Sequence, residues 1–347
     1  MVFSHSRRRA RSLATGVLLL CLIGGAAGAR AAAPGLADGC PASSPACDAR
    51  TARVQAFLDE KVTGGHFGFV LTGIGGSVLA SLRADEGFYP ASSIKVLYLL
   101  EAVRWVGSRD DPVAALRTLL PVNTDGCGGG VLSLEPLDTV LLAMMKQSDN
   151  LRANAVGDFF GLEAINQTAR YLGGVGPGSI VAHRFACGGP ANDPPNRMTA
   201  ADLAGVYARY GAGTLLDAPT ADLFASYFLD AGTGILDAVV AEEAAALGQP
   251  DLAAWFESRV DLIYKAGWWG TDLSVGGYAA LPRRGCSAVY ERRLAFAVFV
   301  SEADAVAPGF DITESVGEVL RQEIRAALAS LSLPAHACRA TWAARPG

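Results

Sequence analysis

The chain has 347 residues, of which 51% are hydrophobic and 18% are charged, and its formal net charge at pH 7 is −5. This is enough apolar sequence for a large folded core, and the acidic balance argues against nucleic acid as a partner. Only four of the 29 Lys and Arg residues are lysines, so the position of each lysine is informative.

The first 31 residues predict a signal peptide. A basic segment at 6–12 precedes an apolar run at 13–29, and Ala29-Arg30-Ala31 suits a signal peptidase. We therefore expect a secreted or periplasmic protein with no stable membrane anchor, exported by either the Sec or the twin-arginine route. Cleavage would remove five arginines and no acid, which takes the formal net charge from −5 to −10.

Six cysteines remain after this cleavage, and an even number in an exported protein favours disulfides. Fifteen connectivities are possible. We expect three pairs, the first on proximity alone: Cys40–Cys47, Cys127–Cys187 and Cys286–Cys338. No C-x-x-C pair is present, so we expect no metal site.

Hydrophobic periodicity predicts the order of the elements. A Pro/Ser/Ala-rich linker at 32–49 leads into one domain at 50–335, which opens with a helix and a β-hairpin. Helical segments dominate the middle, and a lobe at about 91–255 contains a long irregular loop at 174–198. Three strands and a closing helix follow. This order predicts a mixed sheet completed by both ends of the chain, with the helical lobe inserted between them.

Ser92 and Lys95 form the first candidate site, an S-x-x-K motif at the start of a predicted helix. Side chains three residues apart share a helix face, and the positive end of the helix dipole favours a nucleophilic serine. A lysine that is desolvated or lies beside another cation can lose its proton and act as a base, whereas arginine cannot. The alternative interpretation is a helix cap followed by a surface lysine.

Two further motifs follow in the chain. Ser148-Asp149-Asn150 lies between two predicted helices, and Lys265-Ala266-Gly267 ends a predicted strand. Each has an ordinary structural interpretation, a helix cap for the first and an edge-strand lysine beside a turn for the second.

The three motifs in this order resemble the penicillin-recognising serine hydrolases, specifically the class A β-lactamase-like family with its S-x-x-K, S-D-N and K-[ST]-G signature. The resemblance covers roughly residues 50–330. It implies an α+β fold of three layers, with a five-stranded antiparallel sheet built from both chain ends and an inserted all-helical lobe.

The resemblance also implies a role for each motif residue. Ser92 would be acylated, Lys95 would accept its proton, and Ser148 would relay a proton to the leaving nitrogen. Asn150 would bind a substrate amide, and Lys265 would hold Ser148 and a substrate carboxylate. Gly267 would lie at the oxyanion hole, whose donors would be the backbone N–H groups of Ser92 and Trp268. A Cys127–Cys187 bond would clamp the long loop across the entrance.

The sequence departs from the family pattern at two places. Ala266 stands where the family has a Ser or Thr hydroxyl that helps to bind a carboxylate, although Thr271 nearby could substitute. The loop at 174–198 lacks the glutamate that activates the deacylating water in working class A enzymes, and Asp193 is its only carboxylate. We assign Asp193 to turn chemistry and Glu163 to a helix surface. Three further loop residues are expected to pin the loop or bind a ligand: Asn192, Asn196 and Arg197.

These features predict a serine hydrolase that acts on an amide or ester, β-lactams included. A D,D-peptidase or esterase with slow deacylation and a non-catalytic binding protein remain alternatives. We expect a small-molecule or peptidoglycan-like substrate, a monomer, and neither a cofactor nor a metal. We also expect one of the adjacent indoles, Trp268 or Trp269, to pack in the core.

Overall fold

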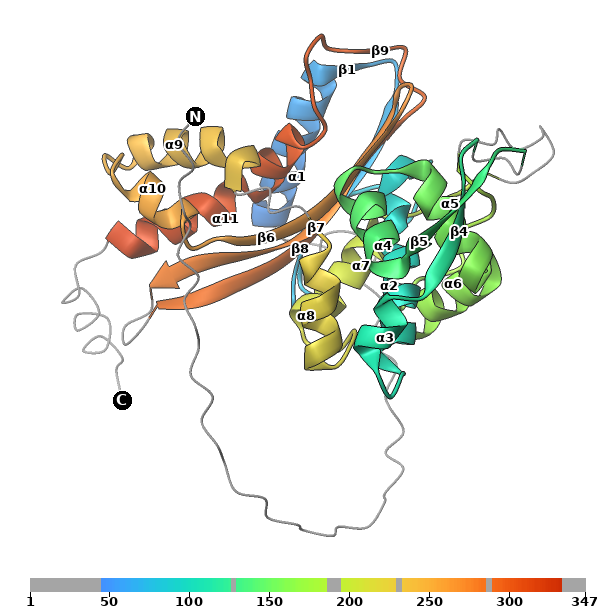
Figure 1. Ribbon diagram of the computed structural model, residues 1–347. Helices are drawn as coiled ribbons and strands as arrows, with labels where there is room; N and C mark the ends of the chain where they lie inside the picture. The colour runs from blue at the N-terminus through green and yellow to red at the C-terminus, as the bar shows by residue number, and fades with distance from the viewer. Residues whose placement is uncertain (1–44, 126–128, 186–194, 229–232, 285–288, 333–347) are drawn as a thin grey trace, which may run out of the picture. The chain divides into compact units, whose positions relative to one another are not determined.

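The computed structural model describes residues 45–125, 129–185, 195–228, 233–284 and 289–332, all of which belong to one compact unit (Figure 1). The predicted signal peptide and five of the six expected disulfide cysteines lie outside these ranges, so the cysteine pairing stays a prediction. Among the described residues, no helix has the length and apolar character needed to cross a membrane.

A five-stranded sheet forms the centre, in the order β3-β2-β8-β7-β6. Its strands come from the two ends of the domain: β2 (His66–Gly73), β3 (Val78–Leu82), β6 (Asp261–Trp269), β7 (Asp272–Arg284) and β8 (Val289–Ser301). All four pairings are antiparallel, which confirms the sheet implied by the resemblance and corrects the mixed sheet expected from element order. The strand β6 lies at an edge, and this exposes one side of its backbone to the site described below.

Successive side chains of β2 pack into different cores, as the two-residue period of a strand requires. Phe67, Phe69 and Leu71 join one hydrophobic cluster, whereas Val70 joins the other. The first cluster packs against four helices on one face of the sheet (Figure 1): α1 (Pro45–Lys61), α9 (Asp237–Ala246), α10 (Leu252–Glu257) and α11 (Glu314–Ser332). A short strand pair, β1 (Val62–Thr63) with β9 (Ala305–Val306), lies beside them.

The second cluster contains Val70 and the buried residues of the inserted lobe, which lies on the opposite face of the sheet. The lobe consists of η1 (Ala91–Ile94), α2 (Lys95–Gly107), α3 (Pro112–Leu116), α4 (Leu137–Lys146), α5 (Asn150–Phe160), α6 (Leu162–Thr168), η2 (Ala169–Gly173), α7 (Ala200–Gly211) and α8 (Ala218–Ser226). The helix α2 is buried along most of its length and forms the axis of the lobe. An apolar helix that is buried on nearly all sides belongs in the centre of a domain.

Three sequence predictions need correction. The lobe is not all-helical, because β4 (Leu119–Asn123) and β5 (Leu132–Pro136) form a hairpin where helices were expected. The lobe also ends near residue 228 rather than 255, since η3 (Thr233–Ile235), α9 and α10 pack with α11 on the other face. The helix α1 begins at Pro45, inside the segment 32–49 that was expected to be a linker, and residues 32–44 lie outside the described ranges.

The buried carboxylate of Glu323 joins α1, β7, β8 and α11. It is 3% exposed and accepts hydrogen bonds from three guanidinium groups: Arg50 at 2.7 Å, Arg283 at 3.0 Å and Arg292 at 3.3 Å. Removing one partner of a buried ion pair leaves the remaining charges uncompensated. The single negative charge of Glu323 therefore reduces the repulsion among three arginines, which carry three positive charges.

We expect Glu323→Gln to lower the free energy of unfolding by about 2 kcal/mol, below the usual range for a buried pair because the arginines keep partial contact with water. Urea denaturation of the two proteins measures this difference. Glu291→Gln is the matched control, since Glu291 and Arg293 form a pair in which both side chains are about half exposed. A loss for Glu323→Gln no larger than that of the control would contradict the assignment.

Candidate active site

Ser92 lies in the 3-10 turn η1, between the edge strand β6 and the start of α2. The residue before it, Ala91, has a φ of 43°, a left-handed conformation that is uncommon for a residue with a side chain. Two hydroxyls fix the turn by donating to the carbonyl of Pro90, Ser93 Oγ at 2.9 Å and Ser274 Oγ at 2.6 Å. The α-helix therefore begins at Lys95, one turn later than expected. Ser92 lies in the turn before it and is half-buried.

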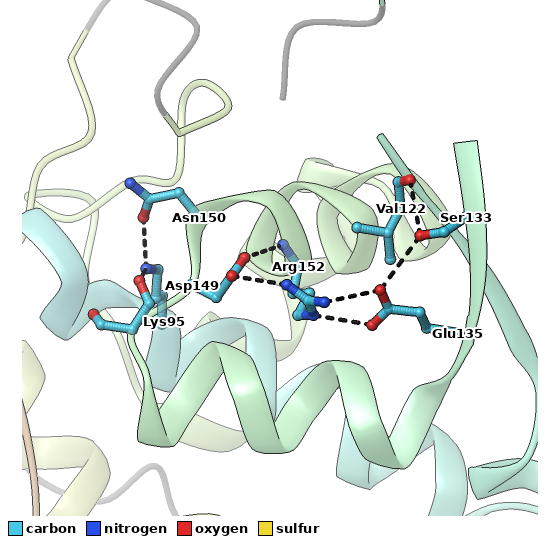
Figure 2. Close-up of polar contacts among 8 residues, drawn as sticks. Lys95, Val122, Ser133, Glu135, Asp149, Asn150 and Arg152 are labelled. Carbon is cyan, nitrogen blue, oxygen red and sulfur yellow. Dashed lines mark hydrogen bonds and ion pairs between the residues drawn. The ribbon is translucent and has the colours of Figure 1, made fainter. Parts of the chain in front are cut away.

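The side chain of Lys95 is fully buried, so it is not the surface lysine of the alternative interpretation. Its Nζ lies 3.0 Å from Ser92 Oγ, 2.5 Å from the carbonyl oxygen of Ser148 and 2.6 Å from Asn150 Oδ1. Figure 2 shows Asn150 reaching down to Lys95 from the start of α5. The first two motifs therefore meet at one amine.

Burial lowers the pKa of Lys95 to about 7, with the charge of Lys265 acting in the same direction and Asp149 opposing it. A neutral amine has two hydrogens and one lone pair. The carbonyl oxygen of Ser148 and the amide oxygen of Asn150 can only accept, so they take both hydrogens. The lone pair is then left for the hydroxyl proton of Ser92, which is the arrangement a general base requires.

Ser148 connects the second and third motifs. Its φ of 58° is left-handed, and it directs the carbonyl oxygen to Lys95 while the hydroxyl accepts from Lys265 Nζ at 2.9 Å. Lys265 is buried on the edge strand and donates also to its neighbour's carbonyl, that of Ala266, at 2.7 Å. Burial lowers the pKa of Lys265 to about 8. Non-glycine residues with positive φ cost free energy, and two of them lie at this site: Ala91 directly before Ser92, and Ser148, which contacts both buried lysines.

Asp149 serves as the N-cap of α5, which confirms the structural interpretation for the middle residue of the S-D-N motif. Its carboxylate accepts the backbone N–H of Arg152 at 2.9 Å and the guanidinium of the same residue at 2.8 Å. Arg152 in turn makes a bidentate contact with Glu135 on β5, with both distances at 2.9 Å (Figure 2). Sequence reasoning missed Arg152 and Glu135, which tie the motif to the β4–β5 hairpin.

Gly267 lies directly against the turn η1 that contains Ser92. A Cβ atom on Gly267 would lie 2.4 Å from the backbone nitrogen of Ser92 and 2.7 Å from that of Ser93. Only glycine allows this close approach, which brings the backbone that leads into Trp268 next to Ser92. Ala266 packs against the α1–α11 core cluster. Both indoles are solvent-exposed, Trp268 at 75% and Trp269 at 59%, so the expectation that one would pack in the core was wrong.

We expect Gly267→Ala to lower the rate of Ser92 modification about a hundredfold. The new methyl group would push β6 away from η1 and so separate the N–H groups of Trp268 and Ser92, the two expected oxyanion donors. Stopped-flow or intact-mass kinetics with a serine-reactive probe measures this rate. Gly205→Ala is the control, since a Cβ at Gly205 on α7 would meet no atom within 4 Å. Equal rates for the two variants would show that the close approach at Gly267 is not needed.

The described part of the long loop is held by three buried asparagine side chains. Asn166 on α6 makes two hydrogen bonds with the backbone of Val181, both at 2.9 Å. Asn196 accepts from the backbone N–H groups of Ala182 at 2.8 Å and His183 at 3.1 Å, which confirms that it pins the loop. Asn154 on α5 hydrogen-bonds both the N–H and the carbonyl oxygen of Phe185.

This anchoring brings a phenyl ring to the amine of Lys95. The ring centroid of Phe185 lies 4.8 Å from Lys95 Nζ. Glu163 is exposed on α6, as predicted, and hydrogen-bonds Gln167 at 3.1 Å. Asp193 and Cys187 lie outside the described residues. Sequence reasoning missed Phe185, although Asn154 follows Asn150 by one helical turn and so signals a second polar residue on that face of α5.

The structure thus gathers Ser92, Lys95, Ser148, Asn150 and Lys265 into one hydrogen-bonded group. Within the part of the chain that the structure describes, no three His, Cys, Asp or Glu side chains are grouped so as to hold a metal ion. The group places a serine hydroxyl beside an amine that can accept its proton, and a second amine beside the hydroxyl of Ser148.

Comparison with known proteins agrees with this geometry. Residues 49–233, which are 185 of the 347, match the model of the beta-lactamase enzyme family. The chain therefore belongs to the beta-lactamase enzyme family. A comparison with curated proteins finds no match.

Solved structures show the same fold at low sequence identity. The β-lactamase from Sphaerobacter thermophilus is 18% identical, with a TM-score of 0.59 and coverage of 83% of this chain and 98% of that one. A class A β-lactamase from Mycobacterium abscessus is 16% identical, with a TM-score of 0.58 and coverage of 80% and 98%. A mutant of PBP-A, solved as an acyl-enzyme complex with penicillin G, is 18% identical, with a TM-score of 0.56 and coverage of 82% and 96%.

Proposed function

We propose that the protein is an exported serine hydrolase that forms an acyl-enzyme at Ser92 with an amide or ester substrate, β-lactams included. The observation that carries the proposal is the buried Lys95, whose amine lies 3.0 Å from Ser92 Oγ and has its hydrogens committed to two acceptors. In the acylation step, Ser92 Oγ attacks the carbonyl carbon and its proton passes to Lys95.

Collapse of the tetrahedral intermediate requires a proton for the leaving nitrogen or oxygen. Ser148 is suited to give it, because its hydroxyl accepts from Lys265 at 2.9 Å and can be reprotonated from the lysine side. The backbone N–H groups of Ser92 and Trp268 would stabilise the oxyanion, supported by the close packing of Gly267 against Ser92. Asn150 would bind a substrate amide through its remaining amide hydrogens.

A second candidate, a D,D-peptidase or esterase with slow deacylation, is favoured by Phe185. Hydrolysis of the acyl-enzyme requires a base that activates water near the ester carbonyl. Among the described residues, the side chain that covers the amine of Lys95 is this phenyl ring and not a carboxylate. Acylation without rapid release is the behaviour expected of such a site.

Incubation of the mature protein with penicillin G distinguishes these functions when hydrolysis and intact mass are followed together. Fast hydrolysis supports a β-lactamase, whereas a persistent adduct that Ser92→Ala abolishes supports the slow-deacylating enzyme. With neither turnover nor adduct, the same assay with p-nitrophenyl acetate separates an esterase from a binding protein. Activity of Ser92→Ala equal to that of the parent would contradict acylation at Ser92.

The two lysines predict the pH dependence of acylation. Lys95 is a base only when neutral, so the rate should rise with pH through a midpoint near 7, the pKa given by its burial. With penicillin G, which carries a carboxylate, the rate should fall again above pH 8 as Lys265 loses its charge. With a neutral fluorophosphonate only the rising limb is expected. A rate independent of pH between 5 and 9 would contradict the role of Lys95.

A further inference from the structure

Phe185 is fixed in place by a single buried side chain. The amide of Asn154, which is 2% exposed, donates to the carbonyl oxygen of Phe185 at 2.8 Å and accepts the N–H of the same residue at 2.7 Å. Both backbone groups of Phe185 are thus satisfied by one residue of α5, the helix that also begins with Asn150. The position of the ring is set by the same element that places an acceptor on Lys95.

The ring closes the surroundings of the catalytic amine. Phe185 is 6% exposed, lies 4.8 Å from Lys95 Nζ and packs against Tyr98 at a centroid distance of 5.6 Å. The three polar neighbours of the amine take up its hydrogen-bonding capacity, and the phenyl ring covers it. The charged groups that act on Lys95 are Lys265 from β6 and Asp149 from the start of α5, and the latter is paired with Arg152.

We propose that Phe185 is a positioning residue, whose ring, clamped by Asn154, keeps water away from the amine of Lys95 and so maintains Lys95 as a neutral base. This inference rests on the proposed acylation of Ser92 and assigns it a residue that does not touch the substrate. It also explains why a phenyl ring lies beside Lys95, at a position where the described residues provide no carboxylate base.

Two effects of the ring on Lys95 oppose each other. A phenyl face attracts a cation and so favours the protonated amine, whereas exclusion of water disfavours it. Burial is the largest cause of the lowered pKa of Lys95. Desolvation of a lysine shifts its pKa by up to several units, more than one phenyl face can offset. Removal of the ring should therefore admit water and stabilise the protonated form.

The test measures how fast a fluorophosphonate modifies Ser92 between pH 5 and 9, by intact mass. In this reaction Ser92 Oγ attacks phosphorus, fluoride leaves, and the hydroxyl proton passes to Lys95. Phe185→Ala should move the rising limb by about one pH unit to the alkaline side, so that the rate falls about tenfold at pH 6 and little at pH 9. Phe185→Leu keeps an apolar cover and should stay within a few tenths of a unit of the parent.

Phe159→Ala is the matched control, because Phe159 is on the same helix as Asn154 but 40% exposed and packed on Trp105 and Phe160. In this variant the rising limb of the modification rate against pH should coincide with that of the parent. An equal loss of rate at every pH in Phe185→Ala, or a shift of its limb to the acid side, would overturn the inference while leaving acylation at Ser92 intact. If the parent is not modified at Ser92 at any pH, the proposed function fails, and this inference fails with it.

Discussion

Lys95→Arg should lower the rate of Ser92 modification by on the order of a thousandfold, a typical contribution of a general base. The substitution keeps a positive charge and a long side chain, but a guanidinium does not lose its proton in a protein. An arginine also has no lone pair to accept the hydroxyl proton of Ser92. In the parent, Ser148 and Asn150 accept the two hydrogens of the neutral Lys95 amine, and its lone pair faces Ser92. The loss should appear at every pH, because no accessible pH creates the base.

Lys146→Arg is the matched control for this substitution, since Lys146 ends α4 and is not one of the hydrogen-bonded group. The modification rate by a fluorophosphonate should be unchanged in this variant. Thermal unfolding of both variants reports whether the larger guanidinium disrupts the buried site. A folded Lys95→Arg protein that reacts at the parental rate would rule out Lys95 as the base.

Phe185→Glu should shorten the lifetime of a penicillin G adduct at Ser92 by about a hundredfold, the lower end of what a positioned general base contributes. The side chain at this position lies beside Lys95, which lies beside the nucleophile, and the Asn154 clamp would hold the new carboxylate there. Such a carboxylate could accept a proton from a water molecule that attacks the ester. Its charge would also raise the pKa of Lys95 and move the rising limb of acylation to higher pH.

Phe185→Gln is the control for shape, because it has nearly the same size as the glutamate but cannot act as a base. Adduct lifetime is measured by intact mass after excess penicillin G is removed. A long-lived adduct in both variants would show that position 185 does not reach the ester. Equal shortening in both variants would assign the effect to the entry of water rather than to base catalysis.

Much of the site is visible in the sequence because its chemistry depends on a rare residue type. Two of four lysines fall in short motifs with fixed spacing, and these two lysines occupy the buried positions 95 and 265. The strands β7 and β8 were likewise predictable, since each contains a long apolar run, although element order alone predicted a mixed sheet and not the antiparallel one. A sequence pattern was therefore sufficient to predict a feature when all the residues of that pattern lie within one helix, strand or turn.

The remainder depends on contacts between segments that are distant in the sequence. The hairpin of β4 and β5 was missed because its apolar residues alternate over only five positions, and five residues fit a helical spacing equally well. The position of Phe185 beside Lys95 results from the amide of Asn154, 31 residues earlier. Ser148 has a left-handed φ of 58°, which its residue type does not favour, while its carbonyl oxygen and hydroxyl contact Lys95 and Lys265.

Acylation at Ser92 is tested most directly by mapping the residue that a fluorophosphonate modifies, using tandem mass spectrometry of the mature protein at pH 8. We expect a single adduct on Ser92, which is lost in Ser92→Ala and retained in the Lys146→Arg control. An adduct on any other serine, or one that persists in Ser92→Ala, would contradict the central role assigned to Ser92 and Lys95.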